Sequence, residues 1–254
     1  MGCRFSGLFS RMADLADTSF SGRALRRRTF LRVAGATAAS SALVLAGCND
    51  KKEDNPTPTP EVTTGTLTFK GDDTGIFNLT YLLAQIQADF YQKLVTTPPA
   101  DFTAADKEAF VDMRDHAVIY REFYKSVLST NAYDSNLTKA LEFNFTPYTL
   151  TTRKGVYEAA SKLEDLGVGA YNGLGRRLRN LSYLRLLLKI ASVKARHAAF
   201  VRDQAEPNSF AGPDVVAITG SQASLDTVKT PVEVATLLSP LVPAVLVADN
   251  LMLL

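Results

Sequence analysis

Residues 74–95 of the chain, TGIFNLTYLLAQIQADFYQKLV, predict a long amphipathic helix. Apolar side chains recur there at alternating spacings of four and three residues, at Phe77, Tyr81, Ala84, Ala88, Tyr91 and Val95. This spacing keeps them on one face of an α-helix. The pair Pro98-Pro99 is expected to close the segment, because proline cannot continue a helix.

Three further segments have the same period, and together the four predict an all-α fold. The second helix is expected over residues 104–128, where Thr103 and Asp106 are spaced as an N-terminal cap. The third and fourth are expected over 155–174 and 182–204. One face of the second helix carries Phe110, Met113, Ala117, Tyr120, Tyr124 and Val127. One face of the third carries Tyr157, Ala160, Glu164, Gly167 and Tyr171, and one face of the fourth carries Leu187, Ala191, Lys194, Ala198 and Val201. Four such helices of about five to seven turns form a four-helix bundle.

The connections indicate how the bundle is wound. The first and second helices, and the third and fourth, are joined by short turns, whereas residues 131–154 form a long connection without a helical period. A long middle crossover is typical of the ferritin-like topology. The bundle is thus expected over about 74–204. The tail, 205–254, is expected to be irregular, with one short helix at about 231–238 and a last apolar stretch that packs on the bundle.

The amino terminus resembles a bacterial export signal. Residues 1–47 contain a twin-arginine-like run, Arg27, Arg28, Phe30 and Leu31, followed by a short apolar stretch and the tetrapeptide that ends at Cys48. The apolar stretch is too short to span a bilayer, which needs about 20 residues. The resemblance implies cleavage before Cys48 and its diacylation, which anchors a protein stably. Arg26 departs from the usual pattern, so twin-arginine and general export both stay open.

Residues 48–66 are rich in Pro and Thr and predict an extended tether before a domain at 67–254. Seven of the 28 Lys and Arg residues and two of the 26 acids precede Cys48. The remainder holds 21 basic and 24 acidic residues, a net charge of −3, so the basic character of the chain belongs to its signal. We therefore expect no nucleic-acid partner.

Three motifs resemble a bacterial ferritin-like family, which includes lipoproteins and some members called desiccation-related proteins. They are DMRDH at 112–116, LEDLGVGAYNG at 163–173 and SVKARHAA at 192–199, and the similarity covers about residues 72–240. Metal-binding members are expected to hold two ions with one Glu from each of two helices and Glu-x-x-His from each of the other two.

The resemblance implies that this ligand set is largely missing here. The positions that match the family's ligands are Ala84, Ala117, Tyr120, Glu164, Lys194 and His197. Only Glu164 and His197 retain a ligand residue type. Two ligands and a nearby ammonium do not hold a hard divalent ion. We therefore expect no metal and no other cofactor at this degenerate site.

A buried ammonium must pair or lose its proton. We therefore expect Lys194 to form an ion pair with Glu164, joined by His197 or by the Tyr120 hydroxyl. The alternative is that Lys194 extends to solvent from the edge of the bundle. His116 lies about 100° from the helix face and is not expected to be a ligand.

The basic stretch between Leu166 and Arg202 either solvates the outer face or attracts an anionic partner. The sequence has no zinc-protease motif, phosphate-binding loop or paired-cysteine motif.

These patterns predict an envelope-anchored lipoprotein, exported and held at the membrane through Cys48, that acts as a non-catalytic structural or binding module. It is expected to form homo-oligomers or to assemble with a metal-binding relative. The alternatives are a di-iron or di-manganese oxidase, an iron-handling protein, or a desiccation- or stress-related protein. Metal content distinguishes the first two alternatives from the structural module.

Overall fold

The computed structural model describes residues 65–135, 137 and 140–253, which belong to one compact unit of the chain. The predicted signal peptide, the lipidation site and residues 48–64 of the tether lie outside the described residues. The predictions that fall there concern Arg27, Arg28, Phe30, Leu31 and Cys48.

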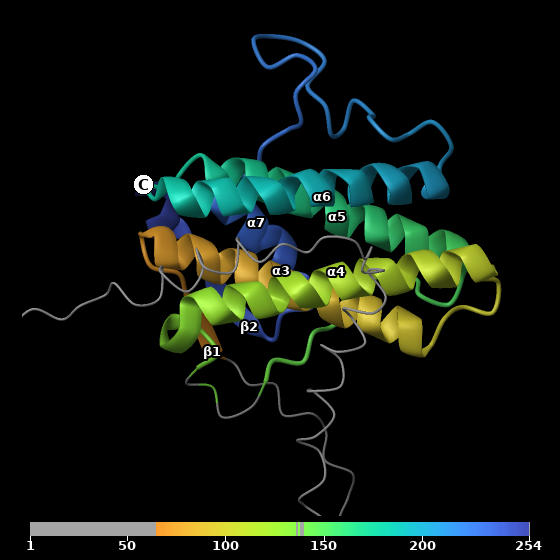
Figure 1. Cartoon of the computed structure of the whole chain (residues 1–254), viewed down its shortest axis with the longest axis horizontal. Helices are drawn as coiled ribbons and strands as arrows, with labels where there is room; N and C mark the ends of the chain where they lie inside the picture. Colours follow the sequence, from red (N-terminus) through yellow and green to blue (C-terminus); the bar gives the residue numbers. More distant parts are fainter. Residues whose placement is uncertain (1–64, 136, 138–139, 254) are drawn as a thin grey trace, which may run out of the picture. The chain divides into compact units, whose positions relative to one another are not determined.

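Four long helices form two hairpins, which confirms the helical bundle. Helix α3 (Asp73–Thr96) packs along α4 (Ala104–Leu128), and α5 (Arg153–Gly175) packs along α6 (Leu181–Ala205). The pairs lie side by side, with α3 also contacting α5 (Figure 1). Every helix boundary lies within two residues of its predicted position.

Polar side chains cap the N-termini of the four long helices. Asp72 Oδ1 accepts from the Gly75 amide at 2.8 Å, and Thr152 and Asn180 cap α5 and α6 in the same way. The predicted Thr103 and Asp106 pair forms a reciprocal capping box at the start of α4. These caps satisfy amides that lack partners inside the helix, so they fix where each helix starts.

Asp106 also joins the two hairpins at one end of the bundle. Its carboxylate accepts from Arg153 Nε and Nη2 at 2.9 Å and from the Tyr157 hydroxyl at 2.6 Å. Although burial raises the pKa of Asp106, the hydrogen bonds from Arg153, Tyr157 and Thr103 outweigh it and hold that pKa well below its usual range. This carboxylate is therefore ionised and links α4 to α5.

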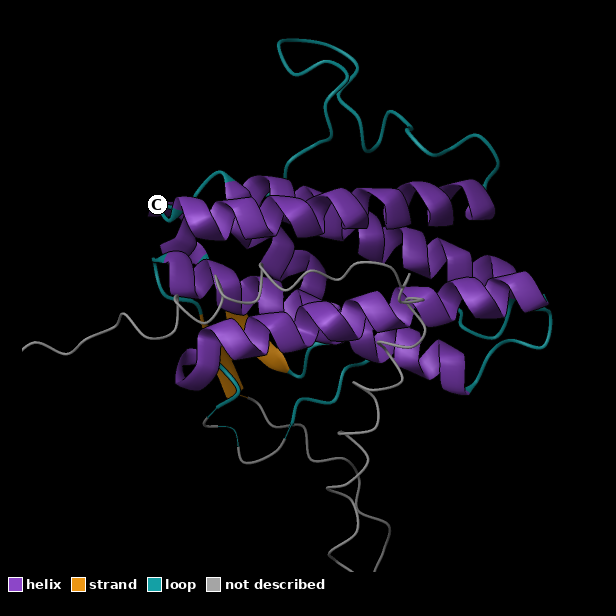
Figure 2. Cartoon of the chain, in the orientation of Figure 1, coloured by secondary structure: helices purple, strands orange, loops and turns teal. Residues whose placement is uncertain are grey.

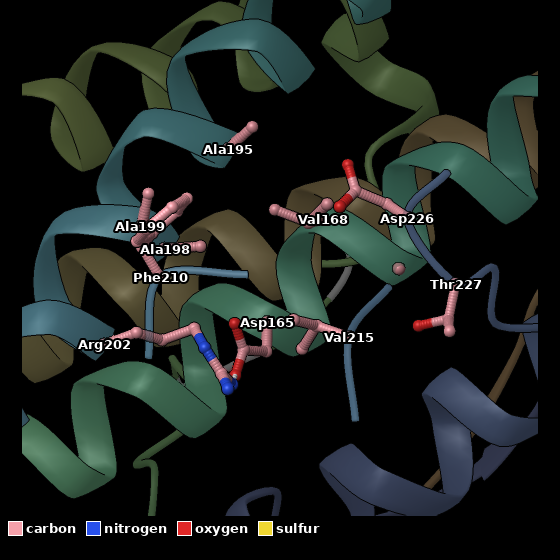
Figure 3. Close-up of a pocket in the computed structure, with 11 residues that line it drawn as sticks. Asp165, Val168, Ala195, Ala198, Ala199, Arg202, Phe210, Val215, Asp226 and Thr227 are labelled. Atoms are coloured by element: carbon pink, nitrogen blue, oxygen red, sulfur yellow. Dashed lines mark hydrogen bonds and ion pairs between the residues drawn. The ribbon is translucent and has the colours of Figure 1, made fainter. Parts of the chain in front are cut away.

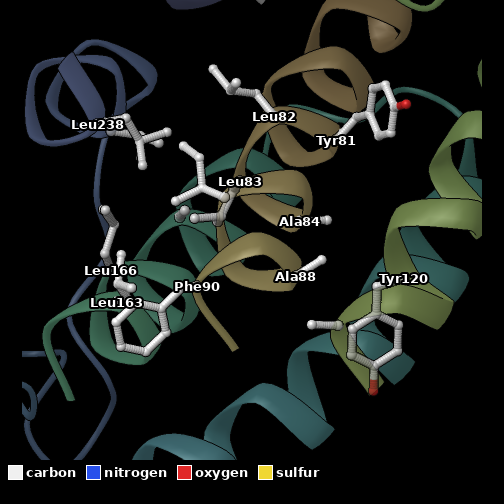
Figure 4. Packing of buried hydrophobic residues seen from close by; sticks show 14 of the residues in the cluster. Tyr81, Leu82, Leu83, Ala84, Ala88, Phe90, Tyr120, Leu163, Leu166 and Leu238 are labelled. Carbon is white, nitrogen blue, oxygen red and sulfur yellow. The ribbon is translucent and has the colours of Figure 1, made fainter. Parts of the chain in front are cut away.

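Helix α3 lies at the centre of the core and is buried on several sides. Figure 4 shows Leu82, Leu83 and Phe90 pointing toward α5 and the tail helix α7 (Pro231–Leu238). Ala84 and Ala88 point the other way, toward Tyr120 of α4 (Figure 4). Since α3 has neighbours on both sides, its polar residues Asn78, Thr80 and Gln87 are also buried.

A two-stranded parallel sheet adds to the all-α fold that the sequence predicts. Strand β1 (Gly65–Thr68) pairs with β2 (Ala244–Val247), with Gly65 opposite Ala244 (Figure 2). The first two residues of β1, Gly65 and Thr66, fall in the segment predicted as tether and belong to the sheet instead.

The tail packs on the bundle through α7 and through the residues around β2. Leu241, Val242, Ala248 and Leu251 are buried in the core. Two 3-10 turns, Ser239–Leu241 and Asp249–Leu253, flank the strand, and a third, Ser129–Asn131, follows α4. Over the described part of the chain, no helix is both long and apolar enough to cross a membrane.

Candidate functional site: a buried polar cluster

The six positions that match the family's metal ligands lie inside the bundle. Ala84 comes from α3, Ala117 and Tyr120 from α4, Glu164 from α5, and Lys194 and His197 from α6. All six are buried, and Glu164 and Lys194 are 0% exposed. The structure therefore brings Glu164, Lys194 and His197 together, while the two alanines contribute only methyl groups.

Glu164 is the only carboxylate of this cluster, and its two oxygens differ. Oε1 accepts a hydrogen bond from the Tyr91 hydroxyl at 2.6 Å. Oε2 lies 3.6 Å from Lys194 Nζ and 3.9 Å from His197 Nδ1, without a hydrogen bond from any described group. One oxygen is thus held firmly and the other faces the cation with a free lone pair.

Lys194 ends in the core, which excludes the alternative that it extends to solvent. Its ammonium donates to Gln87 Oε1 at 2.5 Å and lies 5.4 Å from the centre of the Tyr120 ring. Burial lowers the pKa of Lys194, and the charge of Glu164 opposes that shift. Tyr120 contributes the face of its ring to this contact, a cation–π geometry.

His197 connects the ion pair to a second histidine. Its Nε2 lies 3.0 Å from His116 Nδ1, and the two rings stack with centroids 5.1 Å apart. Burial, followed by the charges of Lys194, His116 and Arg196, lowers the pKa of His197 to about 3. The imidazole is therefore neutral at physiological pH, and the two rings share one hydrogen bond whose direction depends on the tautomer.

Two tyrosines close the cluster. Burial first, and the charge of Glu164 second, raise the pKa of Tyr120 to about 12. The same two causes raise the pKa of Tyr91 well above its usual value. Both phenols are therefore protonated, and Tyr91 acts as a hydrogen-bond donor to the carboxylate.

Three members of the cluster were not among the predicted site residues: Gln87, Tyr91 and His116. Tyr91 lies on the predicted apolar face, and its hydroxyl could have been flagged because a buried tyrosine needs a partner. Gln87 stands beside Ala88 in a largely apolar helix, which is also a signal for a buried polar contact. His116 gave no comparable signal, because it lies away from the predicted face.

The donor set of the cluster does not fit a pair of metal ions. It offers one carboxylate and two imidazoles, together with an ammonium 3.6 Å from that carboxylate. Within the described ranges, no group of three or more His, Cys, Asp or Glu side chains is arranged to hold a metal ion. Hard divalent ions prefer several oxygen donors, and Lys194 would repel them.

Two other cavities lie away from the cluster. The first, about 40 Å³, lies between α5, α6 and the segment 206–230 (Figure 3). The Arg202 guanidinium reaches Asp165 at 2.7 Å and Asp214 at 2.8 Å beside it. A cavity of that volume accommodates about one water molecule and no larger ligand. The contacts of Arg202 with Asp165 and Asp214 therefore serve to hold the segment 206–230 to the bundle.

The second cavity, about 150 Å³, lies between α3, α4 and the crossover. Asp134 accepts hydrogen bonds there from the Tyr81 hydroxyl and from Gln85 Nε2, both at 2.9 Å. Its polar groups therefore join the crossover to α3.

Comparison with known proteins identifies the family. Residues 72–206 match the ferritin-like domain. The chain belongs to the ferritin-like domain family. The match spans all four bundle helices and every residue of the buried cluster. A search of curated proteins finds no significant match to this ferritin-like chain.

Proposed function

We propose that this ferritin-like protein is a non-catalytic structural or binding module of the bacterial cell envelope. In this proposal, a buried ion pair replaces the two metal ions that hold the helices of metal-binding relatives together. The observation that carries the proposal is the position of Lys194, whose ammonium lies 3.6 Å from the single carboxylate of the site.

The charges of the site support this assignment. Glu164 and Lys194 sum to zero, and His197 is neutral, so the cluster needs no cation for balance. A di-metal centre of four carboxylates instead offers a charge of −4 to its ions. Bringing a divalent ion beside Lys194 would place like charges a few ångströms apart in a medium of low polarity, where repulsion is strong.

We also propose that the domain is displayed at a membrane. The arginine pair, the apolar run and Cys48 occur in the order that a lipoprotein signal requires. Residues 49–64 then provide a polar tether before β1. We further propose that the bundle assembles with a second copy or with a metal-binding relative, since a module without chemistry of its own acts through what it binds.

Metal analysis of the purified protein tests the proposal. The protein is incubated with Fe(II) or Mn(II), freed of excess metal and measured by mass spectrometry of the elements. We expect less than about 0.1 ion per chain, against about two for an occupied di-metal site. Near-stoichiometric iron or manganese would reject the proposal in favour of an oxidase or an iron-handling protein.

A further inference from the structure

Gln87, Lys194 and Glu164 form a closed group in the centre of the bundle. The amide oxygen of Gln87 accepts from Lys194 Nζ at 2.5 Å, and its Nε2 donates to the Leu163 carbonyl at 3.1 Å. All three residues are 0% exposed. The amide is thus held between the amine of α6 and the backbone of α5, with a carboxylate beside the amine.

We propose that Lys194 and Gln87 react with each other to form an amide bond that cross-links α6 to α3. The new bond joins Lys194 Nζ to Gln87 Cδ, and the bond from Cδ to Nε2 breaks. The Gln87 amide nitrogen leaves as ammonia. No oxidant, reductant or external group takes part, so atoms and electrons balance within the two side chains.

The distance suits the attack. Because a carbonyl bond measures about 1.23 Å, Nζ lies no more than about 3.7 Å from the amide carbon. Reacting atoms in a near-attack arrangement are about 3–3.5 Å apart, so only a small shift is needed. The hydrogen bond from Nε2 to the Leu163 carbonyl fixes the orientation of the amide, whose oxygen faces the amine.

Glu164 supplies the proton transfers. An ammonium has no lone pair, so Lys194 must lose a proton before it attacks. Glu164 Oε2 lies 3.6 Å away and accepts no hydrogen bond from any described group, which leaves it free to take that proton. Burial favours the neutral amine by lowering the pKa of Lys194. The resulting carboxylic acid protonates the departing nitrogen, and the carboxylate so formed takes the second proton from the new amide nitrogen, which leaves Glu164 protonated.

Gly167 provides space around the reacting groups. A Cβ at this position of α5 would lie 3.2 Å from Gln87 Nε2 and 4.0 Å from Lys194 Cδ. A methyl group at this position would therefore crowd the Gln87 amide, which glycine leaves room for. The nearest atom that it accommodates is the nitrogen that would leave.

The reaction also lowers the electrostatic cost of the site. Before it, a carboxylate and an ammonium are buried together, which is expensive even when they are paired. After it, the core contains an amide and a protonated carboxyl group, neither of which is charged. The product joins the α3–α4 hairpin to the α5–α6 hairpin by a covalent bond.

Mass spectrometry of the purified full chain tests the cross-link. We expect the intact mass to be about 17 Da below that of the unmodified sequence, the mass of one ammonia. After digestion with trypsin, residues 71–93 and 190–196 are expected as one branched peptide, because acylated Lys194 is no longer cleaved. A separate peptide 190–194 and an unshifted mass would overturn the proposal.

Variants locate the reacting groups. Lys194→Met and Gln87→Leu are expected to abolish the mass shift, and Glu164→Gln to slow its appearance by about 100-fold or more, the usual contribution of a general base. Gln85→Leu, two residues away on α3, is the control that keeps the shift. A loss of about 18 Da with Lys194 joined to Glu164, or a shift that persists in Gln87→Leu, would equally refute the assignment.

Discussion

Lys194 and Glu164 face each other inside the bundle, with Nζ 3.6 Å from Oε2 and side-chain exposures of 1% and 0%. They come from the two helices of one hairpin, α6 and α5. A charge so far from water is costly without its partner, whereas removing both charges together costs little. The interaction between the two charges can therefore be measured from the unfolding free energies of single and double variants.

Single and double substitutions of the pair should therefore be strongly non-additive. In the Gln87→Leu background, where the cross-link cannot form and both charges remain, we expect Lys194→Met and Glu164→Gln each to lower the free energy of unfolding by about 3–5 kcal/mol, because each leaves one buried group without its counter-charge. The double variant should lose less than either single variant. Denaturant unfolding monitored by circular dichroism measures all three. Additive losses would show that the two charges do not interact.

The stability of the protein should depend on His197 below neutral pH. Burial lowers the pKa of His197 to about 3 in the folded protein, whereas a histidine in the unfolded chain has the ordinary pKa of 6.5. Between these values the unfolded chain binds one more proton, so stability falls as pH decreases from 6.5 toward 3, by about 1.4 kcal/mol per pH unit.

Replacing this histidine isolates its contribution. His197→Gln should have a shallower dependence of unfolding free energy on pH over that window, measured by urea titrations at several pH values. Equal slopes in the variant and the unchanged protein would contradict a buried neutral imidazole.

The ionisation of Asp106 should determine how much stability the protein loses in acid. Its pKa in the folded protein is depressed below the ordinary 3.8, so its contribution is complete above that pH and is lost as pH falls further. We expect Asp106→Asn to cost about 2–3 kcal/mol at neutral pH, through the weakened cap and the lost Arg153 contact. Its stability should then change less than that of the unchanged protein below about pH 4. Thermal unfolding between pH 2 and pH 7 measures both effects.

Restoring the ligand types should create a metal site. The variant combines Ala84→Glu, Ala117→Glu, Tyr120→His and Lys194→Glu, which with Glu164 and His197 completes four carboxylates and two histidines. We expect about two Fe(II) or Mn(II) ions per chain and a rise in melting temperature when metal is added.

The same variant with Glu164→Ala is its control and should bind less metal. Failure of the restored set to bind metal, in a protein that still folds, would show that the backbone spacing is unsuited to two ions.

Arg202 should hold the segment 206–230 against the bundle. Its guanidinium contacts Asp165, Asp214 and the Ser209 carbonyl at 2.7–2.9 Å. Arg202→Lys keeps the charge but loses the planar fork. We expect about tenfold faster cleavage of this segment in limited proteolysis, which corresponds to about 1.4 kcal/mol. Arg185→Lys, at an exposed site on the same helix, should leave the rate unchanged.

The helices could be predicted because their signals are local. Periodic apolar residues, the Thr103 and Asp106 cap and the Pro98-Pro99 stop act within a few residues of one another. The strand pair could not be predicted in this way. Gly65–Thr68 follows a polar segment and pairs with residues almost the whole domain away, so its conformation depends on tertiary contact.

The site was partly readable for the same reason. Glu164, Lys194 and His197 stand at positions of recognisable motifs, and the structure places them together. Gln87 and His116 depend on how helices are packed, which a single helical face does not specify. Helix α3 is enclosed by α4, α5 and α7, so Gln87 is buried although it lies beside the predicted face. His116 reaches His197 because both side chains extend into the space between α4 and α6.

The pairing of β1 with β2 determines how the domain responds to mechanical force. The strands are parallel and in register from Gly65 opposite Ala244 to Thr68 opposite Val247, and the Phe69 amide extends the ladder to the Val247 carbonyl at 2.9 Å. A pull on the chain that precedes Gly65 acts along the strand, so the interstrand hydrogen bonds are loaded together in shear instead of opening one at a time. Leu251, buried just beyond β2, fastens that strand to the core, so tension on the leading segment meets the strand pair before it reaches α3.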